Sequence, residues 1–191
     1  MMPETIRIAL VFLINTLLNL YLFVLMLRAM LELVRANYFN PLTQFSVRLT
    51  HHLIDPIRRR LPNFYNIETA SVVVIFAIAM IKFFLIALIN GELPHVGGIS
   101  ILALSDMLAL IIQILTYAIL IQAVLSFVQP YSPLVSTLSL LASPIMQPLR
   151  RFIPPIAGLD ITPIPALIFL QLLSMLLINP LMTLGQGFMI R

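Results

Sequence analysis

The sequence predicts an all-α membrane protein in which four transmembrane helices form two hairpins. Two observations lead to this prediction. Charged residues make up only 9% of the 191 residues and hydrophobic residues 61%, whereas about a quarter of an ordinary soluble domain is charged. Four apolar stretches are each about as long as the ~20 residues that a helix needs to cross the hydrocarbon core. The chain also has no cysteine, which excludes disulfides and thiol chemistry.

The four predicted spans cover residues 8–34, 70–89, 101–128 and 164–184. The first is too long for the apolar region of a signal peptide and has no small-residue cleavage pattern, so we expect a retained helix. The third is long enough to tilt or to extend beyond the bilayer. The fourth begins at prolines that break no hydrogen bond in a first helical turn, whereas Pro180 near its end predicts a kink or an early stop.

The connections between the spans predict the orientation of the chain. Residues 90–100 form a short turn rich in glycine and proline, whereas the segments 35–67 and 129–160 are long and hold most of the Lys and Arg residues. With four spans, both long segments lie on one side of the membrane. The positive-inside rule then puts them in the cytoplasm and both termini in the periplasm, for a multi-pass protein of a bacterial inner membrane.

The two halves of the chain repeat each other without gaps. A shift of 92 positions, as from Pro41 to Pro133, aligns three prolines and two arginines with their counterparts. The aligned pairs are Pro41 with Pro133, Pro56 with Pro148, Arg58 with Arg150, Arg59 with Arg151, and Pro62 with Pro154. We interpret residues 1–98 and 99–191 as two copies of one unit. Because each copy has two spans, the copies enter the membrane from the same side and form a parallel repeat.

Each long segment is predicted to contain an amphipathic helix in the membrane interface. Both helices would begin at an N-cap residue followed by proline, Asn40-Pro41 and Ser132-Pro133. Apolar residues then recur at helical spacing, namely Leu42, Phe45, Leu49, Leu53 and Ile57 in the first copy and Leu134, Leu138, Leu141, Ile145 and Leu149 in the second. Such a stripe beside basic residues suits the membrane interface. We expect Pro56 and Pro148 to kink or end the two helices just before the arginines.

The proline-arginine pattern resembles that of the YggT family of bacterial membrane proteins. The carrying motifs are Asp-Pro-Ile-Arg-Arg-Arg-Leu-Pro from Asp55 and Gln-Pro-Leu-Arg-Arg-Phe-Ile-Pro from Gln147, and a basic residue in the second span agrees. The resemblance covers nearly the whole chain. It implies a link with osmotic tolerance and, from chloroplast, cyanobacterial and Gram-positive relatives, with cytochrome-complex assembly, nucleoid distribution or cell division. These associations favour a scaffold or assembly factor by analogy. Gln147 departs from the acid of the first copy.

Two charged residues lie within the predicted spans. Lys82 is about 12 residues into the second span and Asp106 is early in the third, at a similar depth from the periplasmic face. A Lys in hydrocarbon is costly unless it is paired or its amine reaches the interface. We name Asp106 as the partner. Two interpretations stay open: a gate or ion-linked charge pair, and a structural Lys stabilised by the acid.

Other polar residues in the spans favour structural roles. Arg28 and Glu32 are four residues apart, so we expect them to pair along one face of the first helix. Amide side chains could join helices by hydrogen bonds, namely those of Asn15, Asn19, Gln113, Gln122 and Gln171. They are too few for a continuous polar pore through one chain, which argues against a channel formed by a monomer.

The sequence predicts no enzyme activity, no cofactor and no metal site. His51 and His52 are adjacent and point about 100° apart on a helix, so they are poorly placed for one metal ion. No predicted span contains a histidine that could hold a haem. The chain has no phosphate-binding loop, no zinc-protease motif and no clear catalytic triad or carboxylate pair.

The leading hypothesis is a non-enzymatic scaffold or assembly factor that acts through the cytoplasmic loops. Its candidate contacts with anionic phospholipids and a protein partner are Arg48, Arg58, Arg59, Arg60, Arg150 and Arg151. Each basic residue at an anionic surface contributes roughly 1 kcal/mol, so these residues could equally serve orientation and lipid anchoring alone. The alternative hypothesis is a small transporter or ion-conducting protein linked to osmotic stress, using Lys82. A homo-oligomer is left open, and we do not expect direct nucleic-acid binding.

Overall fold

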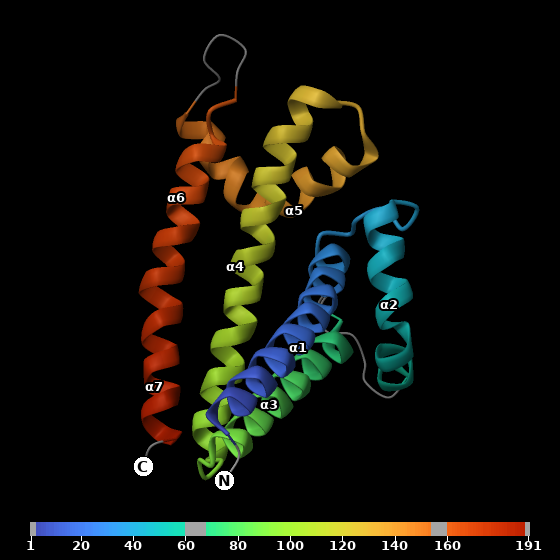
Figure 1. Ribbon diagram of the computed structural model, residues 1–191. Coiled ribbons are helices and arrows are strands. Elements are labelled where there is room, and N and C mark those ends of the chain that lie inside the picture. The colour runs from blue at the N-terminus through green and yellow to red at the C-terminus, as the bar shows by residue number, and fades with distance from the viewer. Residues whose placement is uncertain (1–2, 60–67, 154–159, 190–191) are drawn as a thin grey trace.

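The computed structural model describes residues 3–59, 68–153 and 160–189, and these residues form helices joined by short connections (Figure 1). Four helical segments in the described part are long and apolar enough to cross a membrane. They are α1 (Glu4–Leu33), α3 (Thr69–Asn90), α4 (Val96–Val128), and a fourth span within Pro163–Phe188. The protein is therefore an all-helical, multi-pass membrane protein, as the composition predicts.

The fourth span is one long segment made of three pieces. It consists of α6 (Pro163–Leu173), a π-helical turn η1 (Ser174–Ile178) and α7 (Asn179–Met189). The predicted early stop at Pro180 is wrong, because the helix continues through this residue. The wider π turn directly before Pro180 explains the continuation. Its hydrogen bonds are already not in the α-helical register, so the proline interrupts no regular α-helical hydrogen bonding there.

Two shorter helices, α2 (Pro41–Arg58) and α5 (Pro133–Phe152), stand between the spans of each half. They begin as predicted: the Asn40 side chain accepts a hydrogen bond from the Leu42 amide at 2.9 Å, and the Ser132 side chain accepts one from the Leu134 amide at 3.3 Å. Of the two predicted effects of Pro56 and Pro148, ending the helix is wrong, because α2 and α5 continue past them, and a kink stays a prediction. Both prolines lie in the last turns, where a lost hydrogen bond affects few following residues.

The α2 helix buries three hydroxyl side chains and exposes the middle of its predicted apolar stripe, whose two ends pack against the core. Thr43, Ser46, Thr50 and Ile54 are buried, whereas Phe45, Leu49 and Leu53 are exposed. The polar face is inward because α1 presents a buried arginine there, described below. In α5 the repeat-equivalent buried positions are occupied by Leu138, Ala142 and Met146. The two helices thus bury the same register of the repeat, but α2 has hydroxyl residues at two positions, Ser46 and Thr50, where α5 has apolar ones. Their position relative to a membrane stays a prediction.

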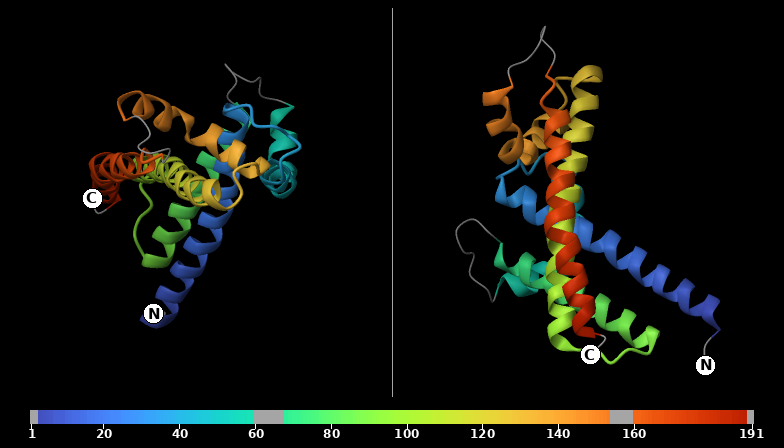
Figure 2. Two further views of the ribbon diagram at one scale, coloured as in Figure 1. Left: turned by 90° about the horizontal axis from the view of Figure 1, so that it is seen from above. Right: turned by 90° about the vertical axis from the view of Figure 1, so that its left-hand side faces the viewer.

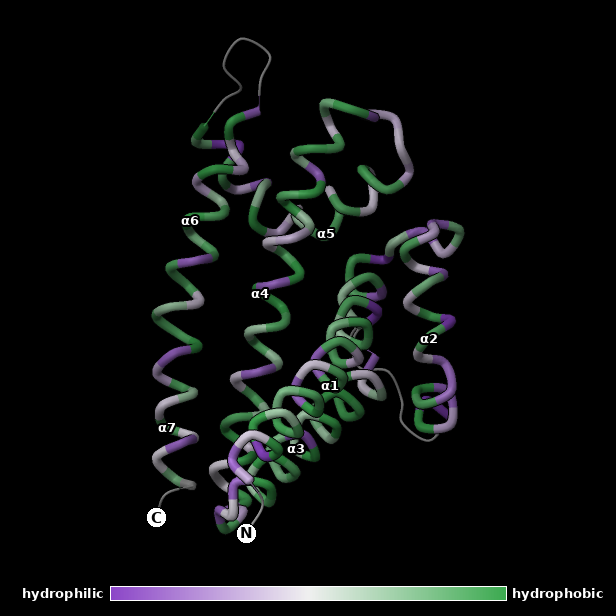
Figure 3. Tube along the Cα trace, in the orientation of Figure 1, coloured by the Kyte–Doolittle hydropathy of each residue, from purple (hydrophilic) through white to green (hydrophobic). Residues whose placement is uncertain are grey.

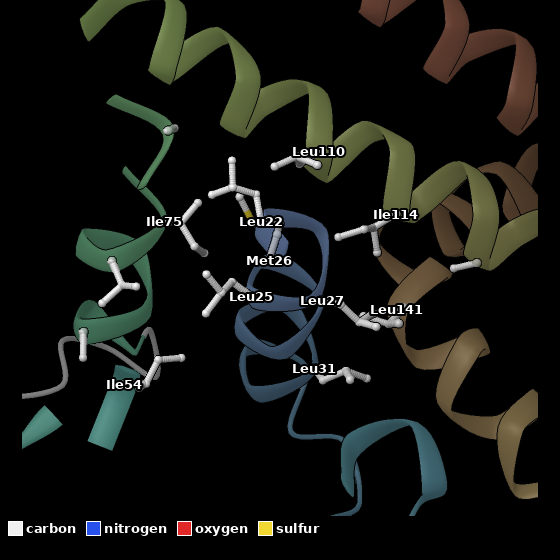
Figure 4. Close-up of a cluster of buried hydrophobic side chains, with 14 of the residues drawn as sticks. Leu22, Leu25, Met26, Leu27, Leu31, Ile54, Ile75, Leu110, Ile114 and Leu141 are labelled. Carbon is white, nitrogen blue, oxygen red and sulfur yellow. The ribbon is translucent and has the colours of Figure 1, made fainter. Parts of the chain in front are cut away.

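The α4 helix is the centre of the molecule. The α1 and α3 helices pack against each other and cross α4 steeply, whereas the fourth span runs alongside α4 (Figure 2). The main core lies where α1 meets α3, α4 and α5, with Leu22, Leu25 and Ile75 on one side and Leu27 near Leu141 on the other (Figure 4). Apolar residues predominate along all four spans, with polar interruptions in α4 and in the fourth span (Figure 3).

Candidate functional site

A cluster of charged side chains is buried where α1, α2 and α3 meet. The Arg28 side chain is 5% exposed, and its Nη2 lies 3.2 Å from Glu68 Oε1. Its Nη1 donates a hydrogen bond of 3.0 Å to Thr50 Oγ1. The Glu68 side chain is fully buried, accepts a hydrogen bond from the Ser71 hydroxyl and lies 3.4 Å from Arg58 Nη1. Each buried charge therefore has an opposite charge within ion-pair distance, which offsets the penalty of removing it from water.

The predicted pair between Arg28 and Glu32 is wrong. Glu32 Oε1 instead lies 3.3 Å from Arg58 Nη2, and Arg28 turns away toward Glu68. The physical reason is burial. Glu68 is fully buried and needs a cation, whereas Glu32 is partly exposed and gains little from a neighbour on its own helix.

The second copy repeats one ion pair of this cluster. Arg150 donates two hydrogen bonds to Asp160 Oδ2, at 3.0 Å from Nε and 2.7 Å from Nη2. Arg58 and Glu68 occupy the repeat-equivalent positions, 92 residues earlier in each case. We call these two pairs the clasps, because each ties the end of α2 or α5 to the acid before the following span. Partial burial would raise the pKa of Asp160, but hydrogen bonds with Thr162 and the charge of Arg150 hold it below its usual range.

The remaining predicted basic residues are exposed. Arg48 lies on α2, Arg59 directly follows α2, and Arg151 is in the last turn of α5. Arg60, Pro62 and Pro154 lie outside the described residues. The six arginines proposed as contacts are therefore not equivalent: Arg58 and Arg150 are engaged in clasps with acids of this chain.

A hydrogen-bonded link joins the two copies at the starts of α2 and α5. The Asn40 Nδ2 group donates to the Pro133 carbonyl at 2.7 Å and to Thr137 Oγ1 at 2.6 Å. The sequence predicts the N-cap role of Asn40 but not this second role. The sequence feature that could have indicated a second role for Asn40 is its difference from the repeat-equivalent residue, Ser132, which has no amide group to donate.

Lys82 and Asp106 are in contact within the spans, as the sequence expects. Lys82 is 1% exposed, and its Nζ lies 2.5 Å from Asp106 Oδ2 and donates a hydrogen bond of 2.8 Å to Asn19 Oδ1. The same ammonium group lies 4.5 Å from the ring centroid of Phe83. The pair thus joins α3 to α4, and Asn19 adds α1. Its buried ammonium is satisfied by protein groups rather than by reaching the interface.

Two cavities share Gln113 and Tyr117 of α4 in their lining, and the larger one also contains Asp106 of the pair. The larger, of about 530 Å³, lies between α1 and α4 and is lined by Asn15, Thr16, Asn19, Leu20, Phe23, Asp106, Ala109, Leu110, Gln113 and Tyr117. The smaller, of about 320 Å³, lies between α4 and the fourth span and is lined by Ala109, Ile112, Gln113, Thr116, Tyr117, Gln171 and Ser174. Four of the five amide residues that the sequence singled out thus line these cavities, and Gln122 does not.

The amide groups at these cavities bond mostly within their own helices. Asn19 Nδ2 donates to Asn15 Oδ1 at 3.2 Å, and Gln113 Nε2 donates to Tyr117 Oη at 3.0 Å. Only Asn19, through Lys82, contributes to the predicted bonding between helices. Among the described residues, no group of three His, Cys, Asp or Glu side chains is arranged to hold a metal ion.

Comparison with known proteins identifies the family. The CCB3/YggT family model matches residues 8–89 and 101–181, one segment in each half of the chain. The chain is 35% identical over 179 residues to protein PA0392 of Pseudomonas aeruginosa, covering 91% of this chain and 90% of that protein. It is 32% identical over 167 residues to YggT of Escherichia coli K12, covering 87% of each chain. No solved structure matches it. These matches show that the chain belongs to the CCB3/YggT family.

Proposed function

We propose that this protein is a non-enzymatic scaffold or assembly factor of the bacterial inner membrane. Its proline-arginine segments would form one cytoplasmic platform that binds anionic phospholipid and an acidic protein partner. The observation that supports this proposal is the pair of clasps. Each clasp fixes one arginine of the repeated motif to the fold, and the arginine next to it in sequence, Arg59 or Arg151, is left exposed.

The link through Asn40 supports a platform rather than two independent loops. It connects the first turn of α5 directly to the N-cap of α2. Two basic positions held by a connected framework lose less conformational freedom on binding than two on separate flexible loops. The positive-inside rule supports a cytoplasmic orientation.

The exposed apolar stripe of α2 supports a lipid-facing role for this helix. Phe45, Leu49 and Leu53 point away from the protein core, and Arg48 is exposed next to Leu49 in sequence. A helix with an outward apolar stripe and exposed basic residues suits a bilayer surface that contains anionic lipid. In this orientation the polar face of α2 contacts protein and its apolar face contacts acyl chains.

A charge-reversal experiment tests the proposed platform. Arg59→Glu combined with Arg151→Glu should abolish recovery of crosslinked partner from native membranes, with topology verified by terminal tags. Arg7→Glu is the matched control, because Arg7 is an exposed basic residue of α1 outside the proline-arginine segments. Recovery that stays at the level of the unaltered protein in the double variant would rule out partner docking by these arginines.

The Lys82–Asp106 pair beside a cavity supports a second candidate, a small ion-conducting protein linked to osmotic stress. Charged groups within spans often mark ion pathways. Purified protein in liposomes would be assayed for cation flux before and after Lys82→Leu. A flux that falls with this change favours conduction, and no flux in the unaltered protein favours the scaffold.

A further inference from the structure

A polar groove runs along one face of α4 between two walls. Its floor consists of Ala109, Gln113, Thr116 and Tyr117, whose spacing of four, three and one residues puts them on one side of a helix. The α1 wall contributes Asn15, Thr16 and Asn19, and the wall from α6 and η1 contributes Gln171 and Ser174. We call this surface the α4 groove. It combines both cavities, which share Ala109, Gln113 and Tyr117.

The α4 groove carries amide and hydroxyl groups but is electrically balanced. Among the lining residues in the part of the chain that the structure describes, Asp106 is the only one with an acidic or basic side chain, and it pairs with Lys82, which lies outside the lining. An ion brought into the groove would therefore find no opposite charge to offset its loss of hydration. Charge complementarity selects an uncharged occupant with hydrogen-bonding groups.

The position of the groove along the spans argues against a lipid headgroup as the occupant. Gln113 lies near the middle of the predicted span 101–128, and Asn19 lies near the middle of the predicted span 8–34. Headgroups lie at the two faces of a hydrocarbon layer about 30 Å thick. Acyl chains reach the middle of that layer but offer no hydrogen bond to the exposed amides of Asn15 and Gln113.

The floor of the groove has the features of a helix-packing surface. Ala109 and Thr116 are small, and small residues let a second helix backbone approach closely within a membrane. The floor extends over about two helical turns. Amide groups at the ends of such a contact form hydrogen bonds between helices in hydrocarbon, where water does not compete.

We propose that the α4 groove binds a transmembrane helix of another membrane protein that carries an uncharged amide or hydroxyl side chain near its middle. Gln113 and Asn15 exchange hydrogen bonds with that side chain, and Ala109 and Thr116 make room for its backbone. A second copy of this chain fits less well, because two concave surfaces do not fill each other. The site deepens the scaffold proposal by naming a partner class, but it does not depend on the exposed arginines.

The experiment uses the full chain in liposomes with synthetic transmembrane peptides of leucine and alanine. One labelled peptide carries a single central Asn, a second carries Leu there, and a third carries Lys. Energy transfer to labelled protein is measured at low peptide-to-lipid ratio, so that the peptides do not pair among themselves. We expect the Asn peptide to bind about tenfold more tightly than the Leu peptide, and the Lys peptide to show no such advantage.

Two variants and a control locate the binding. Gln113→Leu and Asn15→Leu should each remove most of the tenfold advantage, and Gln122→Leu should retain it, because Gln122 lies on α4 but does not line the groove. Helical circular dichroism and size-exclusion profiles verify the fold of each variant. Equal binding of the Asn and Leu peptides overturns the proposal, as does an advantage that survives both variants. A third outcome would make the groove a self-association surface instead. In that outcome no peptide binds, two labelled copies of the protein show energy transfer to each other, and Gln113→Leu abolishes this transfer.

The outcomes distinguish this inference from the scaffold proposal. The peptides have no soluble part that could reach Arg59 or Arg151. Failure of the charge-reversal experiment therefore leaves the peptide result unchanged. Failure of the peptide experiment leaves the arginine platform intact.

Discussion

Replacing Glu68 by Gln should destabilise the fold much more than replacing Asp160 by Asn, although both acids belong to clasps at equivalent positions. The Glu68 side chain is fully buried between Arg28 and Arg58. The Asp160 side chain is 39% exposed and pairs with Arg150 alone. The two substitutions remove the same charge in the same place in the repeat, so they differ in the burial of the acid and in the number of arginines beside it.

The expected magnitudes follow from that difference. Removing one partner of a buried ion pair costs about 3–5 kcal/mol, because the other charge stays buried without compensation. After Glu68→Gln, Arg28 would keep the Thr50 hydroxyl and the Asp55 carboxylate at 3.9 Å. We therefore expect a loss near the lower end, about 3 kcal/mol. A partly exposed pair contributes about 0–1 kcal/mol, which bounds the loss from Asp160→Asn.

The measurement is reversible unfolding of purified protein from mild detergent into SDS, followed by far-UV circular dichroism. The unaltered protein and both variants are compared at one detergent composition and at neutral pH. A second variant, Arg28→Gln with Glu68→Gln, should recover part of the loss, since it also removes the uncompensated cation. Losses for Glu68→Gln and Asp160→Asn that agree within 1 kcal/mol would refute the argument from burial.

Three further predictions follow from the site. In the same SDS assay, Lys82→Met alone should lower the free energy of unfolding by about 3 kcal/mol, and the double variant Lys82→Met with Asp106→Leu should lower it by less. A larger loss in the double variant would contradict the buried pair. Asn40→Ala should cost about 1–2 kcal/mol through the lost cap and the lost link, and speed hydrogen exchange at the first turn of α5. The pKa of the Asp160 carboxyl, measured by NMR, should lie below its usual value. The clasp between Asp160 and Arg150 should therefore hold above the pKa of Asp160 in the unfolded chain and be lost as pH falls through its pKa in the folded protein. Arg150→Gln should raise the pKa of Asp160 in the folded protein.

Depth and spacing along the chain were enough to predict the pair in the spans. Lys82 and Asp106 lie on neighbouring helices at similar distances from the turn between them, and few other groups at that depth could compensate an ammonium. The helix starts at Asn40 and Ser132 were also predictable, because an N-cap followed by proline is a local signal. Both successes rest on information within a short segment or one hairpin.

The wrong pairing of Arg28 with Glu32 has its origin in packing between distant segments. The i,i+4 spacing of Arg28 and Glu32 is a local signal worth a few tenths of a kcal/mol. The requirement of a fully buried Glu68 for a cation is larger, but it appears only when α3 is placed against α1. Periodicity likewise locates the apolar stripe of α2, but it does not tell whether the stripe packs against the protein core or faces away from the protein. In most helices it is the core, and here Arg28 reverses the choice.

The helices α2 and α5 therefore cannot replace each other, although they occupy equivalent positions in the two copies. The second copy has Leu120 at the position of Arg28 and Ala142 at the position of Thr50. A chimera with the α5 sequence in place of α2 would set a guanidinium against an alanine methyl group, which accepts no hydrogen bond. One with the α2 sequence in place of α5 would bury the Ser46 and Thr50 hydroxyls among apolar side chains of α4. The hydroxyl residues that α2 buries and the apolar residues at the same positions of α5 thus prevent an exchange of these two helices.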